Sequence, residues 1–509
     1  MPPVPLSRSA GSSPPTTDRL ARVLALTVVG ALGLSALGGT APAQPARAAA
    51  GPVEAASGTS AAATSGSPAT AAAAARPGAR RSGDSLFPTV GNGGYDVRHY
   101  DIGLAYAAGS RTIAATTTIT ARATHRLSSF SLDLEGLRVT RVRVDGRAAR
   151  FSRTGDKLVV APARSLTGRF TTQVTYDGRP VTHIDPDGSK EGWLPTADGA
   201  TTLNQPVGAM TWFPNNNTPR DKATFSLAVT VPHTLEVASN GNLLSRARHG
   251  SQRTWRWRQT RPMATYLSMI SIGDYRVFSS TMTTVSGRKL PVWSFIDPRW
   301  GSLSAQRRLI PQIIRYQERS FGRYPGTSAG IVVKRIGVGY ALETQDRPVF
   351  DGVPDTATLV HELAHQWYGD AVTPRDWGDI WLNEGFASHA ESLWAAGHGG
   401  PSTRAAFLTA YRAHPAGSPL WRPAPAALTD PSDLFGDPVY TRGGMVLEAL
   451  RQEIGTRHLA TVLRRWAAVD PGRPVSTADF IAVAERVSGE NLGRFFSTWL
   501  YVAQRPVGY

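Results

Sequence analysis

The run His361-Glu362-Leu363-Ala364-His365 is the feature that most restricts what this chain can fold into. In an α-helix, residues four apart lie one above the other on the same face, so two imidazoles at this spacing can bind one cation. Glu362, one step round the helix, then leans toward a water on that cation. The run therefore predicts a helix that carries a metal centre, with Glu362 as the base that activates water.

A third ligand is available nineteen residues after His365, where Glu384 lies inside the run Trp381-Leu382-Asn383-Glu384-Gly385. Catalytic zinc takes three protein ligands and leaves a fourth position for water or substrate. We therefore expect one Zn²⁺ per chain, bound by His361, His365 and Glu384. The alternative is a buried helix whose two histidines are ordinary core residues.

Helix start and stop signals flank both segments. Asp355 or Thr356 can cap the first helix, and Gly369 can end it. A second helical run is expected over 379–396, with Glu384 in its first turns. A hairpin of two helices would bring this carboxylate back onto the two imidazoles.

The first 48 residues are typical of a secretory signal peptide. Three arginines precede an apolar run over 23–38, which is shorter than the roughly 20 residues of a membrane span. Small residues at 41–43 and 46–48 offer cleavage sites. We expect a secreted, extracellular protein with no transmembrane span in the mature chain; an uncleaved anchor is the alternative.

Residues 49–91 are rich in Ala, Gly, Ser, Thr and Pro, and we expect them to form a disordered linker. The chain contains no cysteine, which excludes disulfides and thiolate metal sites. Its formal charge is +17, but the basic residues are scattered without an aromatic-interleaved stripe. This pattern argues against nucleic-acid binding and allows only loose attraction to anionic cell surfaces.

The remaining sequence predicts an α+β protein of two domains. Residues 92–285 contain short alternating strand patterns, typical of an antiparallel β-sandwich or saddle. Residues 286–509 are expected to form a mainly helical, thermolysin-like catalytic domain, with a small strand near 330–334. Its expected helices are 305–321, 356–368, 379–396, 443–453, 477–488 and 492–501.

With these motifs in order, residues 92–509 resemble the gluzincin aminopeptidases of peptidase family M1, which include membrane alanyl aminopeptidase and leukotriene hydrolase. The family's zinc signature matches His361, Glu362, His365 and Glu384 without departure, including the run Asn383-Glu384-Gly385-Phe386-Ala387. Many relatives carry a large C-terminal helical domain. This chain has no corresponding segment, which suggests an open cleft and a monomer.

The resemblance also implies a site for the free α-ammonium of a peptide. The family's Gly-x-Met-Glu-Asn loop corresponds to residues 340–344, where only Glu343 is retained. A carboxylate beside the metal would select a cation at a fixed distance from the scissile carbonyl. Gln205, at the start of the run 205–214, would add its amide oxygen. Family members often carry Arg where Met210 stands here, which puts the way this loop is held in doubt.

Tyr440 matches the tyrosine of the family's Tyr-x-Lys-Gly segment, with Arg442 in place of Lys. By resemblance, its phenol would donate a hydrogen bond to the oxyanion that develops on the attacked carbonyl. Tyr411 is the weaker competitor for this role.

Several other residues near the motif have ordinary explanations. His389 and His398 are expected to be plain core or surface histidines. Glu391 could orient a ligand, but a structural role is the favoured expectation. Trp367, Trp377, Trp381 and Trp394 are expected to pack around the site.

The sequence therefore predicts a zinc aminopeptidase that acts on peptides with a free N-terminus. Two alternatives remain. A thermolysin-like endopeptidase shares the HExxH run and a distant glutamate, but it has no need of Glu343 or of a β-rich domain. A catalytically silent surface-binding protein would have no need of the full set of zinc ligands, base and tyrosine.

Overall fold

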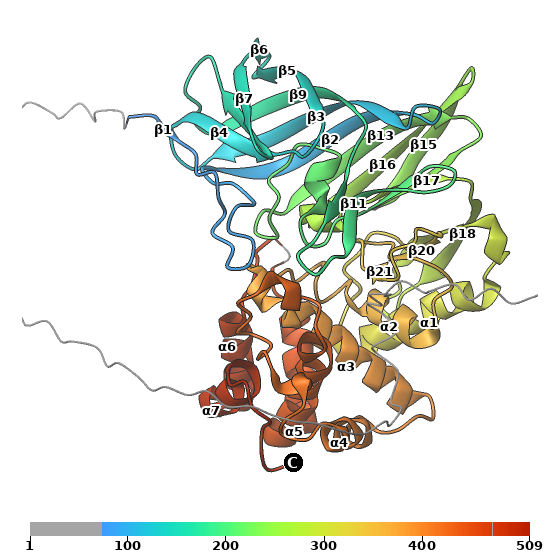
Figure 1. Cartoon of the computed structure of the whole chain (residues 1–509). Coiled ribbons are helices and arrows are strands. Elements are labelled where there is room, and N and C mark those ends of the chain that lie inside the picture. Colours follow the sequence, from blue (N-terminus) through green and yellow to red (C-terminus); the bar gives the residue numbers. More distant parts are fainter. Residues whose placement is uncertain (1–73, 471) are drawn as a thin grey trace, which may run out of the picture. The chain divides into compact units, whose positions relative to one another are not determined.

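The computed structural model describes residues 74–470 and 472–509. The expected signal peptide and residues 49–73 of the expected linker lie outside these ranges. Strands fill the described chain as far as Ile296, and helices dominate after it (Figure 1). No helix among the described residues is long and apolar enough to cross a membrane.

The N-terminal region is built on an eight-stranded sheet whose strands alternate between buried and more exposed side chains, as in β13. The order is β15-β16-β13-β2-β3-β9-β5-β6. The bounds are β2 (Tyr95–Ala107), β3 (Thr112–Ala123), β5 (Arg138–Val144), β6 (Arg147–Ala148), β9 (Arg169–Gly178), β13 (Ala223–Pro232), β15 (Asn242–His249) and β16 (Gln252–Met263).

Two smaller sheets complete this region. One has the order β1-β4-β8-β7 and the other β10-β11-β12-β17-β14. Their bounds are β1 (Arg76–Pro77), β4 (Leu127–Asp133), β7 (Arg150–Thr154), β8 (Lys157–Ala161), β10 (Thr182–Ile184), β11 (Lys190–Pro195), β12 (Ala200–Leu203), β14 (Glu236–Ser239) and β17 (Ile270–Gly273).

The expectation of purely antiparallel pairing is wrong at two places. β13 pairs with β2 in parallel, from Thr224 opposite His99 to Thr230 opposite Ala105, and β1 pairs with β4 in parallel. The partners are far apart in sequence, and such long connections permit parallel neighbours, whereas short hairpins force antiparallel ones. Alternation of side chains along a strand does not reveal this direction.

The expected linker over 49–91 extends too far along the chain, because residues 74–91 belong to the fold. Leu86 and Phe87 are buried, and the Phe87 ring packs edge-on against Trp377 at 6.5 Å between centroids. The N–H of Arg76 donates to the carbonyl of Arg126 at 2.9 Å. Two apolar anchors and backbone hydrogen bonds, which need no particular side chain, are enough to order a segment of linker-like composition.

The C-terminal region contains a five-stranded sheet of order β18-β19-β20-β22-β21. The strands are β18 (Arg276–Thr283), β19 (Lys289–Ile296), β20 (Ala329–Val333), β21 (Ala341–Leu342) and β22 (Val349–Phe350). The expected boundary at 285/286 would cut the β18–β19 hairpin, in which Arg276 lies opposite Ile296.

The helices follow the expected pattern with three differences. Their bounds are α1 (Ser304–Phe321), α2 (Thr356–Ala364), α3 (Trp381–Gly397), α4 (Thr403–Ala413), α5 (Gly443–Ala467), α6 (Thr477–Ser488) and α7 (Gly493–Phe496). The sequence reading missed α4, and α2 ends before the expected residue 368. The helix expected over 443–453 is also too short, because α5 continues past Gly455, a non-helical residue with a φ of 82°.

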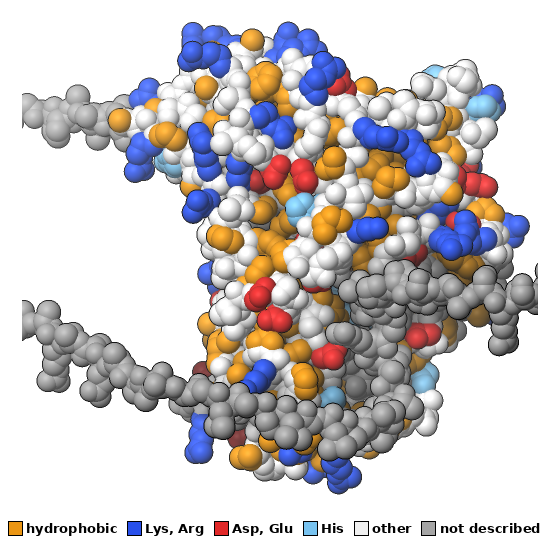
Figure 2. Space-filling model, in the orientation of Figure 1, with side chains coloured by type: hydrophobic (Ala, Val, Ile, Leu, Met, Phe, Trp, Pro, Cys, Tyr) orange, Lys and Arg blue, Asp and Glu red, His pale blue; other side chains and the backbone are white. Residues whose placement is uncertain are grey.

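Basic side chains are spread over the surface. On the face drawn in Figure 2 they lie in separate small groups over the strands, with hydrophobic and uncharged side chains between them. The expectation that they form no continuous stripe holds on this face.

Arg220 joins three segments at the junction of the two regions. Its guanidinium donates to the carbonyl oxygens of Ser82, Gly83 and Arg375 at 2.7–3.0 Å, and it pairs with Asp376 at 3.0 Å. The segment that had been expected to be a linker therefore ties the strand region to the helical region.

Replacing Arg220 with Ala should lower the free energy of unfolding by about 2–3 kcal/mol, because one charged group supplies all of these hydrogen bonds. Urea titration would measure the change. Arg98→Ala is the matched control, because Arg98 forms an exposed pair with Asp96 that should contribute less than about 1 kcal/mol. Equal losses in the two variants would contradict the structural role of Arg220.

Candidate active site

Helix α2 carries His361, and His365 follows it at the C-cap with helical backbone angles. The helix begins at the expected cap, where the Asp355 carboxylate accepts the N–H of Thr358 at 2.7 Å. The two imidazole rings lie 4.8 Å apart between centroids. Both side chains are almost completely buried. The four-residue spacing has therefore placed the rings side by side, as expected.

Helix α3 returns Glu384 to these rings. One carboxylate oxygen, Oε2, lies 3.2 Å from His361 Nε2 and 3.4 Å from His365 Nε2. The ligand atoms of the three residues all lie within 4.8 Å of one another, so they could hold one metal ion. The expected helix hairpin thus brings the three predicted ligands together.

The other nitrogen of each ring faces an acceptor. His361 Nδ1 lies 2.7 Å from Glu391 Oε1, and His365 Nδ1 lies 3.0 Å from the carbonyl of Tyr368. A proton on Nδ1 satisfies both acceptors and leaves the Nε2 lone pairs directed toward Glu384. The expectation that Glu391 is merely structural is therefore wrong, because its carboxylate orients a predicted ligand.

The buried charges are strongly coupled to these rings. Although burial favours the neutral acid, His365 and His361 hold the pKa of Glu384 down to about 2. Burial opposes a charge on His365, but Glu384 and Glu343 raise its pKa to about 9. The carboxylates around the imidazoles thus favour positive charge at this point.

Glu362 lies beside the rings. Its Oε2 atom is buried and has no hydrogen-bond partner among the described residues. Burial raises its pKa to about 8, against the opposing charges of His361 and His365. One of its oxygens lies within 4.8 Å of ligand atoms of Glu343 and His365. This is the environment expected of a general base.

Glu343 and Gln205 meet across the junction of the two regions. Gln205 Nε2 donates to Glu343 Oε1 at 2.8 Å, and both residues are buried. Burial also raises the pKa of the Glu343 carboxyl. Because its amide nitrogen faces Glu343, Gln205 has its amide oxygen left as an acceptor. The strand region and the helical region therefore each contribute one of the two predicted amine-binding groups.

Tyr440 lies over the predicted ligand His361. Its ring is nearly parallel to that of His361, with 5.9 Å between centroids and 23° between planes. It belongs to the π-helical turn η7 (Pro438–Arg442) ahead of α5. The buried Arg442 guanidinium fixes this turn by donating to the carbonyls of Trp421, Thr498, Trp499 and Val502 at 2.7–3.1 Å.

A glycine contact sets how closely Tyr440 approaches the ligands. A Cβ atom on Gly385, next to Glu384, would lie 2.7 Å from the carbonyl carbon of Gly443. The start of α5 can therefore pack on α3 only because both positions lack side chains. Tyr411, the competitor of Tyr440, is buried elsewhere and donates to the carbonyl of Pro506 at 2.6 Å.

His389, His398 and the tryptophans near the motif are not among the groups of side chains that could hold a metal ion. Burial lowers the pKa of His389 to about 4, so this ring is neutral, and His398 stacks on Trp394 at 3.7 Å. Trp367 and Trp381 are buried, and each donates its indole N–H to a nearby acceptor. Their expected role in packing is consistent with this structure.

Sequence reasoning missed Gln366, which supports the amine-binding segment. Its Oε1 accepts the N–H of Asp346 at 2.6 Å, and its Nε2 donates to the carbonyl of Glu343 at 3.3 Å. A glutamine following the second histidine carries no signal of this role. Only the folded arrangement of α2 beside residues 343–346 reveals it.

Comparison with known proteins agrees with this geometry. Residues 97–267 match the model of the peptidase M1 N-terminal domain, and residues 354–499 match that of the peptidase family M1 domain. A "Probable aminopeptidase 1" from Sulfurisphaera tokodaii is 27% identical over 50% of this chain and 34% of its own length. Aminopeptidase N from Caulobacter vibrioides is 25% identical over 74% of this chain and 46% of its own length. The chain thus spans between a third and a half of these curated relatives.

A solved structure matches over nearly its whole length. The M1 zinc metallopeptidase from Deinococcus radiodurans is 28% identical, with a TM-score of 0.76 over 84% of this chain and 98% of its own. A variant of that enzyme has been solved with a Tyr-Ser-Ala substrate bound. Together with the ordered motifs and the two matched domains, these similarities confirm the resemblance seen in the sequence: the chain belongs to peptidase family M1.

Proposed function

We propose that this protein is a zinc-dependent aminopeptidase that removes single residues from peptides with a free N-terminus. The observation that carries the proposal is the pairing of Gln205 with Glu343 beside the His361–His365–Glu384 group. The grouped ligands supply hydrolytic chemistry, and the adjacent polar pair supplies a reason for acting at a chain end.

The donor set fits zinc. It has two imidazole nitrogens and one carboxylate, the composition found in catalytic zinc sites that keep a position open. The Nδ1 atoms of both rings already face acceptors, so the Nε2 atoms are the ones available to a metal. His361, His365 and Glu384 would hold one ion per chain. When bound, zinc lowers the pKa of a water and polarises a carbonyl.

The side chains around this site have separate roles in the reaction. Glu362 accepts the proton of the attacking water and delivers it to the nitrogen of the leaving amine. Tyr440 donates its phenol hydrogen to the carbonyl oxygen as negative charge develops there. Burial of both the base and the ligands keeps bulk water from competing for these hydrogen bonds.

Glu343 and Gln205 fix the position of the substrate's N-terminus. The carboxylate of Glu343 and the amide oxygen of Gln205 accept hydrogen bonds from the α-ammonium, and burial strengthens this charge-assisted contact. Only the first peptide bond then reaches Glu362 and Tyr440. The relatives named as aminopeptidases, and the Deinococcus radiodurans enzyme solved with a tripeptide substrate, support this choice over an endopeptidase.

The alternatives explain less of the site. A thermolysin-like endopeptidase has no use for a buried polar pair contributed by the β-rich domain. A catalytically silent binding protein would not need Glu362, a carboxylate that can take up a proton, beside a complete set of metal ligands. We further propose, from the N-terminal sequence, that the enzyme acts outside the cytoplasm.

Replacing Glu362 with Gln should leave zinc bound and lower kcat by about 10²–10⁴-fold, because the variant loses only the proton acceptor. Elemental analysis and hydrolysis of aminoacyl-coumarin substrates would measure both quantities. A variant that keeps wild-type turnover would remove Glu362 from the mechanism.

N-acetylation of an aminoacyl-coumarin substrate should lower kcat/KM by at least about a hundredfold, because the α-ammonium and its charge-assisted hydrogen bonds are lost. In Glu343→Gln the difference between free and acetylated substrate should shrink, since the carboxylate charge is gone. Preference for the blocked substrate would favour the endopeptidase instead.

Replacing Glu391 with Ala should weaken zinc binding by about 10–100-fold, because His361 loses the carboxylate that orients its ring. Competition with a chelator would measure the affinity. Glu448→Gln is the matched control, since Glu448 is a buried carboxylate that pairs with Arg451 at 2.7 Å and does not contact the imidazoles. Equal effects in both variants would count against an orienting role for Glu391.

A further inference from the structure

The backbone of Val207, two residues after Gln205, is held at both its N–H and its carbonyl. Glu191, on β11, accepts the N–H of Val207 with both carboxylate oxygens, at 3.1 and 3.3 Å. Asn217 donates its Nδ2 to the carbonyl of Val207 at 2.5 Å. Val207 lies two residues after Gln205, so these two side chains fix the backbone from which the Gln205 amide extends.

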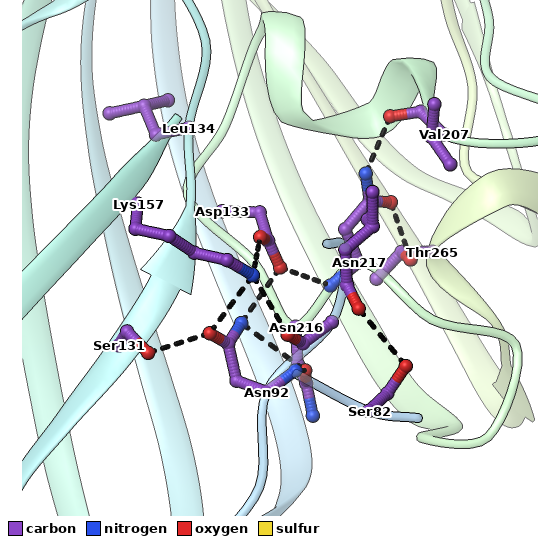
Figure 3. Close-up of polar contacts among 12 residues, drawn as sticks. Ser82, Asn92, Ser131, Asp133, Leu134, Lys157, Val207, Asn216, Asn217 and Thr265 are labelled. Atoms are coloured by element: carbon purple, nitrogen blue, oxygen red, sulfur yellow. Dashed lines mark hydrogen bonds and ion pairs between the residues drawn. The ribbon is translucent and has the colours of Figure 1, made fainter. Parts of the chain in front are cut away.

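Asn217 is itself anchored in a buried polar network (Figure 3). Its N–H donates to Asp133 Oδ2 at 3.1 Å, and Asn92 Nδ2 donates to the same oxygen at 2.7 Å. Lys157 pairs with the other oxygen of Asp133 and donates to the carbonyl of Gly91 at 2.8 Å. The network therefore reaches from the N-terminal segment, through the β4–β8 pair, to the loop that presents Gln205.

Glu191 is well suited to hold a backbone N–H without adding charge. It is completely buried, and burial together with neighbouring Asp185 raises its pKa well above the ordinary range. A side-chain hydrogen bond with Asp185 contributes to this rise in the pKa of Glu191. The loop also packs directly on β11, because a Cβ on Gly208 would lie 2.4 Å from the nitrogen of Gly192.

We propose that Glu191 and Asn217 are positioning residues that set the preference for a free α-amine by aiming Gln205 at Glu343. This inference rests on the proposed aminopeptidase function. Neither residue touches the reacting atoms. Each acts through Val207, so that the 2.8 Å contact between the Gln205 amide and Glu343 is already formed when a peptide arrives.

The physical reason is pre-organisation. A hydrogen-bonding group that must be ordered at the moment of binding loses part of its binding energy to conformational entropy. A misplacement of about 1 Å is enough to weaken a catalytic arrangement strongly. Freeing either the N–H or the carbonyl of Val207 would let the loop move and leave a buried backbone group without a partner.

The test compares Asn217→Ala and Glu191→Ala with the wild-type protein on free and N-acetylated aminoacyl-coumarins. In each variant KM for the free-amine substrate should rise roughly tenfold, the equivalent of one buried hydrogen bond. Zinc content and kcat should change little, and the advantage of the free amine over the acetylated form should fall. Glu191→Gln should restore wild-type KM within about twofold, because a glutamine matches a protonated glutamic acid in shape and retains an acceptor oxygen.

A double-mutant cycle separates positioning from general destabilisation. If Asn217 acts through Gln205, then Asn217→Ala should add little to the KM of Gln205→Ala, whereas a purely structural effect should add in full. Thr117→Val is the matched control, because it removes a buried hydrogen bond to Tyr176 at 3.0 Å elsewhere in the same region. It should lower Tm and leave KM and amine preference unchanged.

The outcomes distinguish the inference from the function on which it rests. An active wild-type aminopeptidase whose KM and amine preference survive both alanine substitutions would overturn the positioning role alone. Additive effects of Asn217→Ala and Gln205→Ala would overturn it as well. A wild-type protein that binds zinc and does not cleave free-amine substrates would overturn the proposed function itself. Should Glu191→Ala fail to fold, the Asn217→Ala cycle decides the question.

Discussion

The hydrogen bond between Gln205 and Glu343 makes the site depend on the junction between the two regions. One partner comes from the strand region and the other from the helical region, so any sliding between them would separate the pair. The junction is correspondingly well bonded. Tyr266 donates to the carbonyl of Gly369 at 3.1 Å, and Asn240 donates to that of Gln345 at 2.8 Å. Gly369 and Gln345, which accept these two hydrogen bonds, lie close in sequence to the ligand His365 and to Glu343.

Burial of charge explains why these residues need one another. Glu343, Glu362 and Glu384 are buried around two imidazoles, and the partly buried Glu391 contacts one of them. Isolated buried carboxylates are costly, and their charge is tolerated only beside opposite charge or with a raised pKa. Both solutions occur here, since Glu384 stays ionised against the histidines while burial raises the pKa of Glu362 to about 8. The same excess of carboxylate over imidazole charge favours a divalent cation in the middle.

Sequence patterns predicted the parts of this arrangement that depend on short-range geometry. The helix hairpin followed from the spacing of His361, His365 and Glu384, and α6 was bounded correctly because Ser476 and Asp479 form a capping box. Contacts between distant segments could not be predicted in this way. Glu391 lies seven residues beyond Glu384, and nothing in that spacing shows that its helix face meets His361. Likewise, the ordered structure of residues 74–91 depends on the burial of Leu86 and Phe87 by segments far away in the chain.

The loop that carries Gln205 shows how an altered family motif can be stabilised by different contacts. Relatives often carry an arginine where Met210 stands, and a guanidinium there could fix the loop by charge. Met210 is buried and offers no polar atom able to replace it. The loop is held instead through its backbone, by Glu191 on the N–H of Val207 and Asn217 on its carbonyl. Because neither a carboxyl group nor an amide is a cation, this arrangement fixes Gln205 without placing a positive charge beside the carboxylate that must receive the substrate's ammonium.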